Sequence, residues 1–282
     1  MAVNILIVSG FLGTGKTTFI KECIRRACFA ENTVILENDF GSTNLDAAVL
    51  EHSQFVIEAM SAGCICCSLS TDLVTTLKRL ISRYQPSTIV IEPSGVAKLS
   101  DLLFTLRHPD LADLIATPRS VVTLDVHNHA LYQKNFGAFY DDQLRYADYF
   151  YPTFIADESP DEVLATLQAT TNQHAVRLDS LDREQFEALF TMPVSEQYLT
   201  KPFASQDQFR SYTLTENLAF TAKTFTDFQS YIKAQAKIVR IKGQITIDDQ
   251  PYSLQYSLAG LNVSASEPMP LELVIIETKK SA

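Results

Sequence analysis

GFLGTGKT, residues 10–17, fits the phosphate-loop pattern G-x-x-x-x-G-K-[ST] at every fixed position. The context also fits, because an apolar run at residues 4–9 reads as a buried strand and residues 17–28 read as a helix. Glycines let successive backbone N–H groups point inward at a phosphate, and the helix N-terminus adds its positive dipole end. The stretch therefore predicts a nucleotide-binding loop between a strand and a helix.

Two side chains of this loop have predicted roles in the chemistry. Lys16 is expected to reach the β- and γ-phosphates, and the Thr17 hydroxyl is expected to ligate Mg²⁺, which prefers hard oxygen ligands. The predicted nucleotide-binding residues are Gly10, Gly13, Thr14, Gly15, Lys16, Thr17 and Thr18.

The chain up to about residue 205 alternates between strand and helix patterns. Strand patterns recur at residues 33–37, 54–58, 87–92, 120–125 and 149–155, and helix patterns at residues 72–84, 141–147 and 160–170. Such alternation is typical of an α/β fold with a doubly wound, mostly parallel sheet. We therefore predict a P-loop NTPase domain over residues 1–205.

The pattern changes beyond residue 205. Extended patterns at residues 211–214, 237–247, 252–258 and 271–277 follow one another closely, and residues 226–236 form the one helical pattern among them. A run of strands with a single helix predicts a small α+β domain over residues 206–282.

Composition and charge exclude several classes of protein. Hydrophobic residues make up 46% of the 282 residues, which excludes a disordered chain. The formal net charge of −10 repels nucleic acid and anionic membranes, so neither is expected as a partner. No apolar run reaches the roughly 18 residues that span a bilayer, and residues 2–12 lack the basic flank and cleavage site of a signal peptide. The expected location is therefore cytoplasmic.

A second acidic position follows the strand pattern at residues 87–92. This strand ends in Glu92, and Pro93-Ser94-Gly95 comes next. Phosphoryl transfer at a phosphate loop needs a carboxylate on a neighbouring strand end to hold Mg²⁺ or its water. Glu92 is expected in that role, and the Gly95 N–H is expected to meet the γ-phosphate. The alternative is a purely structural turn, since these residue types also favour turns.

Three cysteines lie close together in Gly63-Cys64-Ile65-Cys66-Cys67. Their segment follows the strand at residues 54–58, so it should lie at the carboxyl edge of the sheet, where open α/β folds bind ligands. Thiolates suit Zn²⁺ or Cu⁺, and Cys64, Cys66 and Cys67 are the predicted metal ligands. The alternative is a set of inert cysteines packed in a loop. Cys23 and Cys28 are five positions apart on the predicted helix, share no face of it, and are expected to be packing residues.

Four motifs together resemble one family. GFLGTGKTT, Asn38-Asp39-Phe40-Gly41, the GCICC run and Glu92-Pro93-Ser94-Gly95 have the order and spacing of the CobW-type GTPases, which belong with the UreG- and HypB-like metallochaperones. The resemblance covers about residues 4–150 and implies GTPase activity, a Zn²⁺-binding C-x-C-C loop and delivery of metal. It also implies that Asp39 lies in a switch segment near Mg²⁺ or the cysteine metal.

The sequence departs from the family at the motif that should recognise the guanine base. The family's N-K-x-D motif should follow the strand near residue 149, but the segment reads Thr153-Phe154-Ile155-Ala156-Asp157. A shift of one residue would place Asp157 where its carboxylate could accept the guanine N1–H and N2–H. The predicted nucleotide is therefore GTP, with ATP as the alternative.

Three functions fit these motifs. The first is a Mg²⁺-dependent GTPase, or a less selective NTPase, that couples hydrolysis to binding zinc or another metal and delivering it to a client protein. A nucleotide- or metal-dependent homodimer is one form that it could take. The second is a P-loop kinase for a small molecule, and the third is a non-enzymatic, nucleotide-gated zinc-binding regulator. The C-x-C-C run and Glu92-Pro93-Ser94-Gly95 favour the first.

Overall fold

The structure, a computed structural model, describes residues 2–37, 56–59, 69–153, 159–168, 176–177, 182–191, 209–257 and 260–279. These residues fall into two compact units, one ending at Thr191 and the other beginning at Phe209. The domain boundary predicted between residues 205 and 206 lies outside the described residues and stays a prediction. No helix in the described ranges combines the length and apolar character needed to cross a bilayer.

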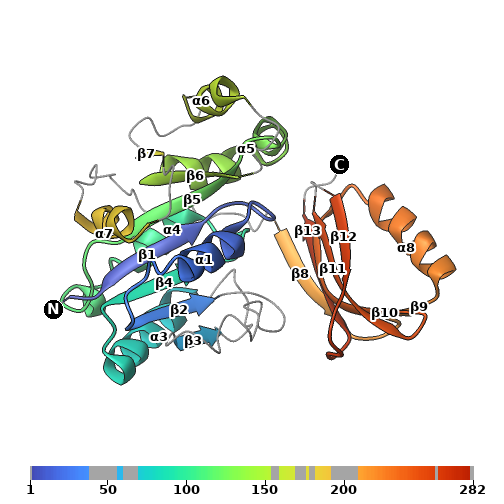
Figure 1. The fold of residues 1–282 in the computed structure, drawn as a ribbon, viewed down its shortest axis with the longest axis horizontal. Helices are drawn as coiled ribbons and strands as arrows, with labels where there is room; N and C mark the ends of the chain where they lie inside the picture. The colour runs from blue at the N-terminus through green and yellow to red at the C-terminus, as the bar shows by residue number, and fades with distance from the viewer. Residues whose placement is uncertain are drawn as a thin grey trace. The chain divides into compact units, whose positions relative to one another are not determined.

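The first unit contains a parallel sheet with the strand order β3-β2-β4-β1-β5-β6-β7 (Figure 1). β2, β3 and β4 lie on one side of β1 and β5, β6 and β7 on the other, which confirms the predicted doubly wound α/β fold. β2, β4 and β5 are buried along their whole length, as parallel strands covered on both faces should be. The strands are β1 Asn4–Ser9, β2 Thr33–Glu37, β3 Val56–Ala59, β4 Thr88–Glu92, β5 Arg119–Asp125, β6 Tyr149–Thr153 and β7 Val176–Arg177.

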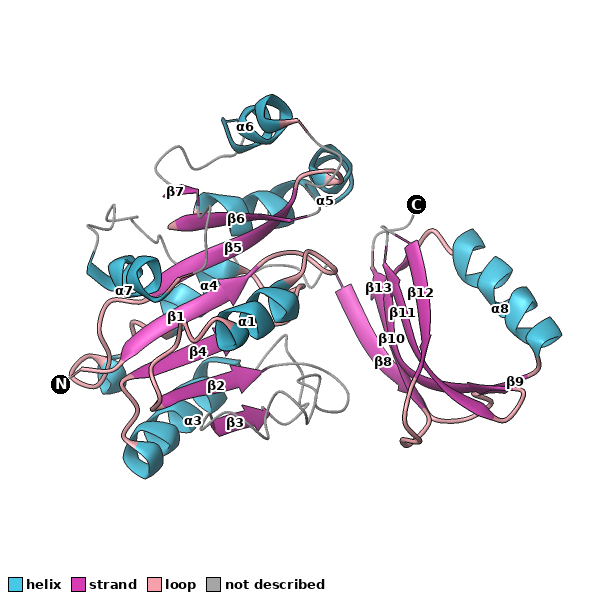
Figure 2. Ribbon diagram, in the orientation of Figure 1, coloured by secondary structure: helices cyan, strands magenta, loops and turns pink. Residues whose placement is uncertain are grey.

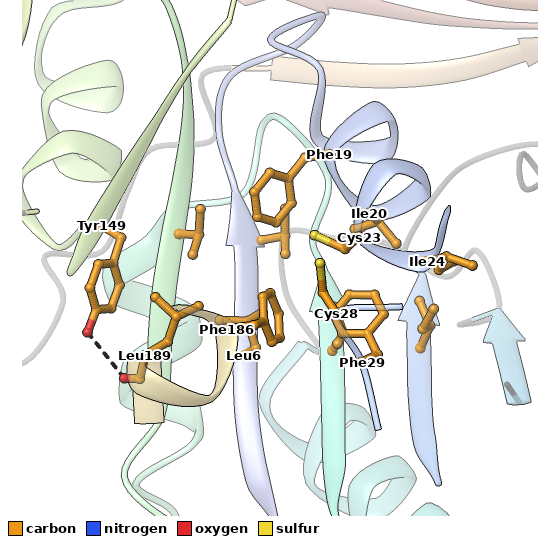
Figure 3. Packing of buried hydrophobic residues seen from close by; sticks show 14 residues of the cluster. Leu6, Phe19, Ile20, Cys23, Ile24, Cys28, Phe29, Tyr149, Phe186 and Leu189 are labelled. Atoms are coloured by element: carbon orange, nitrogen blue, oxygen red, sulfur yellow. Dashed lines mark hydrogen bonds between the residues drawn. The ribbon is translucent and has the colours of Figure 1, made fainter. Parts of the chain in front are cut away.

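Helices cover both faces of this sheet. α1 and α7 lie on one face, while α3, α4 and α5 lie behind the strands in Figure 1. Phe19 of α1 and Phe186 of α7 pack into one core with Leu6 of β1 (Figure 3). The helices are α1 Lys16–Arg25, α3 Leu69–Tyr84, α4 Leu99–Thr105, α5 His129–Arg145, α6 Pro160–Gln168 and α7 Arg183–Thr191, with the 3-10 helix η1 at Pro109–Leu111.

The helix predicted over residues 17–28 ends three residues early. Ala27 has a positive φ of 53°, and its N–H bonds to Ile24 O at 3.0 Å while the Cys28 N–H bonds to Cys23 O at 2.9 Å. This pair of bonds is a Schellman motif, which brings the residue after the cap back onto the helix. Cys28 therefore meets Cys23 from beyond the end of the helix, and both are buried packing residues of the α1 core, as predicted (Figure 3).

In its described residues, the second unit has a mostly antiparallel sheet and one helix, as predicted for a small α+β domain (Figure 2). Its strand order is β12-β11-β10-β13-β8, and the short β9 pairs with β10. Phe225 and Ile232 of α8 share a core with Ile241 of β10 and Leu254 of β11. The elements are β8 Phe209–Leu214, β9 Ala219–Phe220, α8 Ala222–Ala234, β10 Ile238–Ile247, β11 Gln250–Ser257, β12 Gly260–Ala265 and β13 Glu272–Thr278.

Candidate functional site

The phosphate loop leaves β1 at Gly10 in a conformation that only glycine adopts easily. Gly10 has φ 144°, and a Cβ there would lie 2.3 Å from Thr123 Oγ1 and 2.8 Å from Thr123 O. Any side chain at this position would therefore push the loop away from β5. The glycine that begins the loop is needed for packing as well as for its turn.

Threonines fasten the loop to the strands beside it. The Thr14 hydroxyl donates to Phe11 O at 2.8 Å and shares a 2.8 Å hydrogen bond with the Thr123 hydroxyl of β5. The Thr153 hydroxyl of β6 donates to Thr14 O at 3.0 Å. Thr14 was predicted to contact nucleotide, but its buried side chain is engaged in holding the loop, so any contact would come from its backbone. Gly13 and Thr18 are exposed.

Lys16 lies along the loop that should cradle the phosphates. Its Nζ donates to Gly10 O and Phe11 O, both at 3.1 Å, and the side chain is only 6% exposed. A lysine held in this way needs little ordering when a phosphate arrives, because its rotamer is already fixed over the loop.

Thr17 and Glu92 meet although they are 75 positions apart. The Thr17 hydroxyl, at the start of α1, donates to Glu92 Oε1 at 2.7 Å, and Glu92 ends β4. The parallel pairing of β1 with β4 causes this meeting, because it places the end of β4 beside the loop that follows β1. Since the hydroxyl proton points at the carboxylate, the lone pairs of the Thr17 oxygen are available to a cation. The Thr17 hydroxyl and the Glu92 carboxylate thus offer hard oxygen ligands of the kind that Mg²⁺ prefers.

Glu37 adds a second carboxylate that the sequence analysis missed. It ends β2 and pairs in register with Glu92 of β4. Their strand neighbours Ile35 and Val90 both pack into the α1 core, so by the two-residue alternation Glu37 and Glu92 project on the α1 face. Both are nearly buried. Glu37 ends an apolar strand in the same way as Glu92, and this shared pattern could have predicted its place in the site.

Gly95 lies directly against the phosphate loop. A Cβ on Gly95 would lie 2.8 Å from Leu12 N and 2.9 Å from Leu12 Cα, so only glycine permits this approach. The turn after Glu92 is thus in contact with the loop, as a segment that responds to the γ-phosphate must be. The sequence analysis predicted that the Gly95 N–H meets the γ-phosphate, and this role stays a prediction.

Asp125, which sequence analysis did not single out, anchors α5 beside the loop. Its carboxylate is fully buried at the end of β5 and accepts hydrogen bonds from Asn128 N at 3.0 Å and Asn128 Nδ2 at 2.9 Å. The Tyr132 hydroxyl donates to Asp125 Oδ2 at 3.1 Å. Burial, together with the Asp125 charge, raises the pKa of Tyr132, so this hydroxyl stays protonated and keeps donating.

Five predicted site residues lie outside the described residues: Asp39, Cys64, Cys66, Cys67 and Asp157. Their roles remain predictions. The segment with Asp39 follows Glu37 of β2, and the three cysteines follow β3, which pairs with β2 in parallel. β2 and β3 therefore end at the same edge of the sheet as β1, which leads into the phosphate loop. In the part of the chain that the structure describes, no three His, Cys, Asp or Glu side chains form a cluster that could hold a metal ion.

Curated relatives resemble the first part of the chain. Zinc chaperone CobW of Sinorhizobium sp is 33% identical over 126 residues, covering 42% of this chain and 33% of the relative. Zinc chaperone YeiR of Escherichia coli (strain K12) is 31% identical over 103 residues, covering 36% of this chain and 31% of the relative. Zinc chaperone YjiA of the same organism is 27% identical over 151 residues, covering 52% of this chain and 47% of the relative. The matched regions thus span less than half of the length of these relatives.

A solved structure and a family agree with this likeness. The crystal structure of Zn(II)-bound YjiA GTPase from E. coli has a TM-score of 0.50 and 18% identity over 99% of this chain and 95% of that one. At this identity the likeness concerns the fold. Residues 4–175 match the family described as CobW/HypB/UreG, nucleotide-binding domain. Because this match takes in well over half of the 282 residues and includes the phosphate loop, Glu92 and Gly95, the chain belongs to the CobW/HypB/UreG family.

Proposed function

We propose that this protein is a Mg²⁺-dependent GTPase that couples hydrolysis to the binding and delivery of zinc. The observation that carries the proposal is the 2.7 Å hydrogen bond from Thr17 to Glu92 beside the phosphate loop. It unites a loop hydroxyl with a strand-end carboxylate, which is the pair that holds the metal in P-loop enzymes.

Each residue of the site has a task in phosphoryl transfer. The loop amides and Lys16 bind the β- and γ-phosphates and neutralise their charge. Thr17 and Glu92 hold Mg²⁺ directly or through water, and the ion supplies charge stabilisation to the transferring phosphoryl group. Gly95, in contact with Leu12, offers its N–H to the γ-phosphate and responds when that phosphate leaves.

Zinc enters this proposal as cargo. Cys64, Cys66 and Cys67 are thiol donors that suit zinc, and Asp39 is the residue proposed to lie between the zinc and the nucleotide. Glu37 supports that connection, because it lies beside Glu92 and two positions before Asp39. Relatives named zinc chaperones support the choice of metal. The receiving partner is a client protein, and a homodimer formed with nucleotide or metal is part of the proposal.

A product assay tests this function against its alternatives. Incubation with Mg²⁺ and either GTP or ATP should release free phosphate and nucleoside diphosphate, and the reaction should stop when Mg²⁺ is chelated. Transfer of the γ-phosphate to a small acceptor instead would indicate a kinase. Tight binding of nucleotide and zinc without turnover, even with zinc present, would indicate a regulator and contradict the GTPase proposal.

The choice of base is tested in the same assay. We expect weaker discrimination between GTP and ATP than in a protein with an intact N-K-x-D motif, because the asparagine and lysine are missing. Asp157→Ala should erase the preference for GTP that remains. A strong preference that survives this substitution would show that guanine is read elsewhere.

A further inference from the structure

The aromatic contacts between α5 and the phosphate loop are shortest in the first half of the helix. Phe11 of the loop packs against Tyr132 and Phe136 of α5, with ring centroids 5.1 Å and 4.5 Å apart. Asp125 holds the start of the same helix, as described above. At Gly137 the backbone leaves the helical conformation, with φ 41° and ψ −121°, and the helix continues in a new direction to Arg145. The first half of α5 therefore has a fixed place relative to the loop.

The second half of α5 holds the turn that follows Glu92. The Gln143 Nε2 donates to Ala97 O at 3.1 Å and, more weakly, to Gly95 O at 3.4 Å. The neighbouring Asp142 accepts from Ser100 N at 3.1 Å and from the Ser100 hydroxyl at 2.6 Å. Gln143 thus binds the backbone of the turn at Gly95 and Ala97, and the adjacent Asp142 binds Ser100 in the first turn of α4.

The chemistry of Gln143 fits this task better than a packing role. Both of its partners are carbonyl oxygens, which only accept, so the amide nitrogen must face them and both N–H groups are used. The side chain is fully buried, and in the described residues its Oε1 has no hydrogen-bond partner. A buried acceptor without a partner lowers stability, so an apolar residue would serve packing better. What an apolar residue would not supply is the pair of donors.

Gly95 connects this contact to the nucleotide site. It lies so close to Leu12 that no Cβ fits between them, so a displacement of the Gly95 peptide must be felt by the phosphate loop. Gln143 holds the carbonyl of the same residue whose N–H is assigned to the γ-phosphate. Gln143 therefore contacts Gly95, and Gly95 in turn contacts the phosphate loop.

We infer that Gln143 is a positioning residue that fixes the Gly95 turn for recognition of the γ-phosphate. It touches no nucleotide and acts through Gly95, and the inference rests on the proposed GTPase function. A diphosphate lacks the group that Gly95 meets, so Gln143 should matter for the triphosphate and not for the diphosphate.

The test compares Gln143→Met with Gln133→Met. Methionine has nearly the shape of glutamine but no donor, and Gln133 is a partly buried glutamine on the first half of α5 with one long contact, 3.5 Å, to Asp141. Without nucleotide, amide hydrogen exchange over residues 95–100 should speed up by about tenfold in Gln143→Met, the effect of roughly one hydrogen bond. It should not change in Gln133→Met. Affinity for a non-hydrolysable GTP analogue should fall by a similar factor, about tenfold, while affinity for GDP is retained.

The outcomes separate this inference from the proposed function. If wild-type protein hydrolyses GTP but Gln143→Met keeps normal exchange over residues 95–100 and the normal ratio of analogue to GDP affinity, the inference is wrong and the GTPase proposal stands. If the wild type does not hydrolyse GTP, the proposed function fails, whereas the exchange result still decides whether Gln143 holds the turn. Should Gln143→Met not fold, Gln143→Asn keeps the amide on a shorter side chain and should shift both readouts in the same direction. Unchanged readouts in a folded Gln143→Asn would also overturn the inference.

Discussion

At the scale of single residues, Lys16 is the cation that is already placed over the phosphate loop, held by Gly10 O and Phe11 O. Lys16→Ala should weaken binding of GTP by about two orders of magnitude, because charge-assisted bonds to the phosphates are lost. Without nucleotide the melting temperature should fall only slightly, because the two hydrogen bonds from Nζ to Gly10 O and Phe11 O are lost. Calorimetric titration and a thermal melt measure the two effects. Wild-type affinity in this variant would contradict the assignment of the loop.

Glu92 allows a sharper substitution at the same scale. Glu92→Gln keeps the shape of the side chain and an acceptor for the Thr17 hydroxyl, but it removes the charge that Mg²⁺ requires. GTP hydrolysis should slow by about tenfold or more, while nucleotide stays bound through the loop. Glu31→Gln, an exposed change of the same kind, serves as the control. Equal rates in the two variants would remove Glu92 from the mechanism.

At the scale of elements, the backbone at the end of α1 is strained, and a substitution can relieve this strain. Ala27 occupies the left-handed position of the Schellman motif with φ 53°, where an L side chain is strained. Ala27→Gly should therefore raise the free energy of unfolding by about 1 kcal/mol. Denaturant unfolding at equilibrium measures the change. A decrease would contradict the assignment of backbone strain to Ala27.

Elements also differ in how far the sequence predicts them. The strands that lead into the phosphate loop and into Glu92 were predicted closely, because apolar runs bounded by turn residues mark buried parallel strands. α5 was predicted only for residues 141–147 but begins at His129, since Gly137 and the aromatic residues around it obscure the helical period. β12 was missed because only Leu261 and Val263 alternate toward the core, which is too short a pattern to mark a strand.

The contacts of the candidate site were harder to predict than its motifs. Glu37 pairs with Glu92 through the register of β2 on β4, and Gln143 meets Gly95 across 48 positions. A single sequence shows neither relation, because both arise from the order of strands in the sheet. The phosphate loop could be predicted because all its fixed positions lie within one short stretch, residues 10–17.

At the scale of the whole molecule, we propose that nucleotide binding and zinc binding are energetically coupled. The phosphate loop follows β1, Glu92 ends β4, and β2 and β3 end at the same edge of this parallel sheet. The γ-phosphate with Mg²⁺ orders such segments, so zinc affinity should depend on which nucleotide is bound. Linkage then requires zinc to change triphosphate affinity by the same factor. Because thiols must lose protons to bind zinc, its affinity should also fall as the pH is lowered.

The most direct test is calorimetric titration of Zn²⁺ into the apo protein, the GDP complex and the complex with a non-hydrolysable GTP analogue. We expect the affinity for zinc to differ between the GDP and analogue complexes by about 5–150-fold, the usual range of allosteric coupling. Cys64→Ala or Cys66→Ala should abolish the zinc heat and leave nucleotide binding largely intact. Equal zinc affinities in all three states would mean that the two sites are only neighbours, and would contradict the coupling.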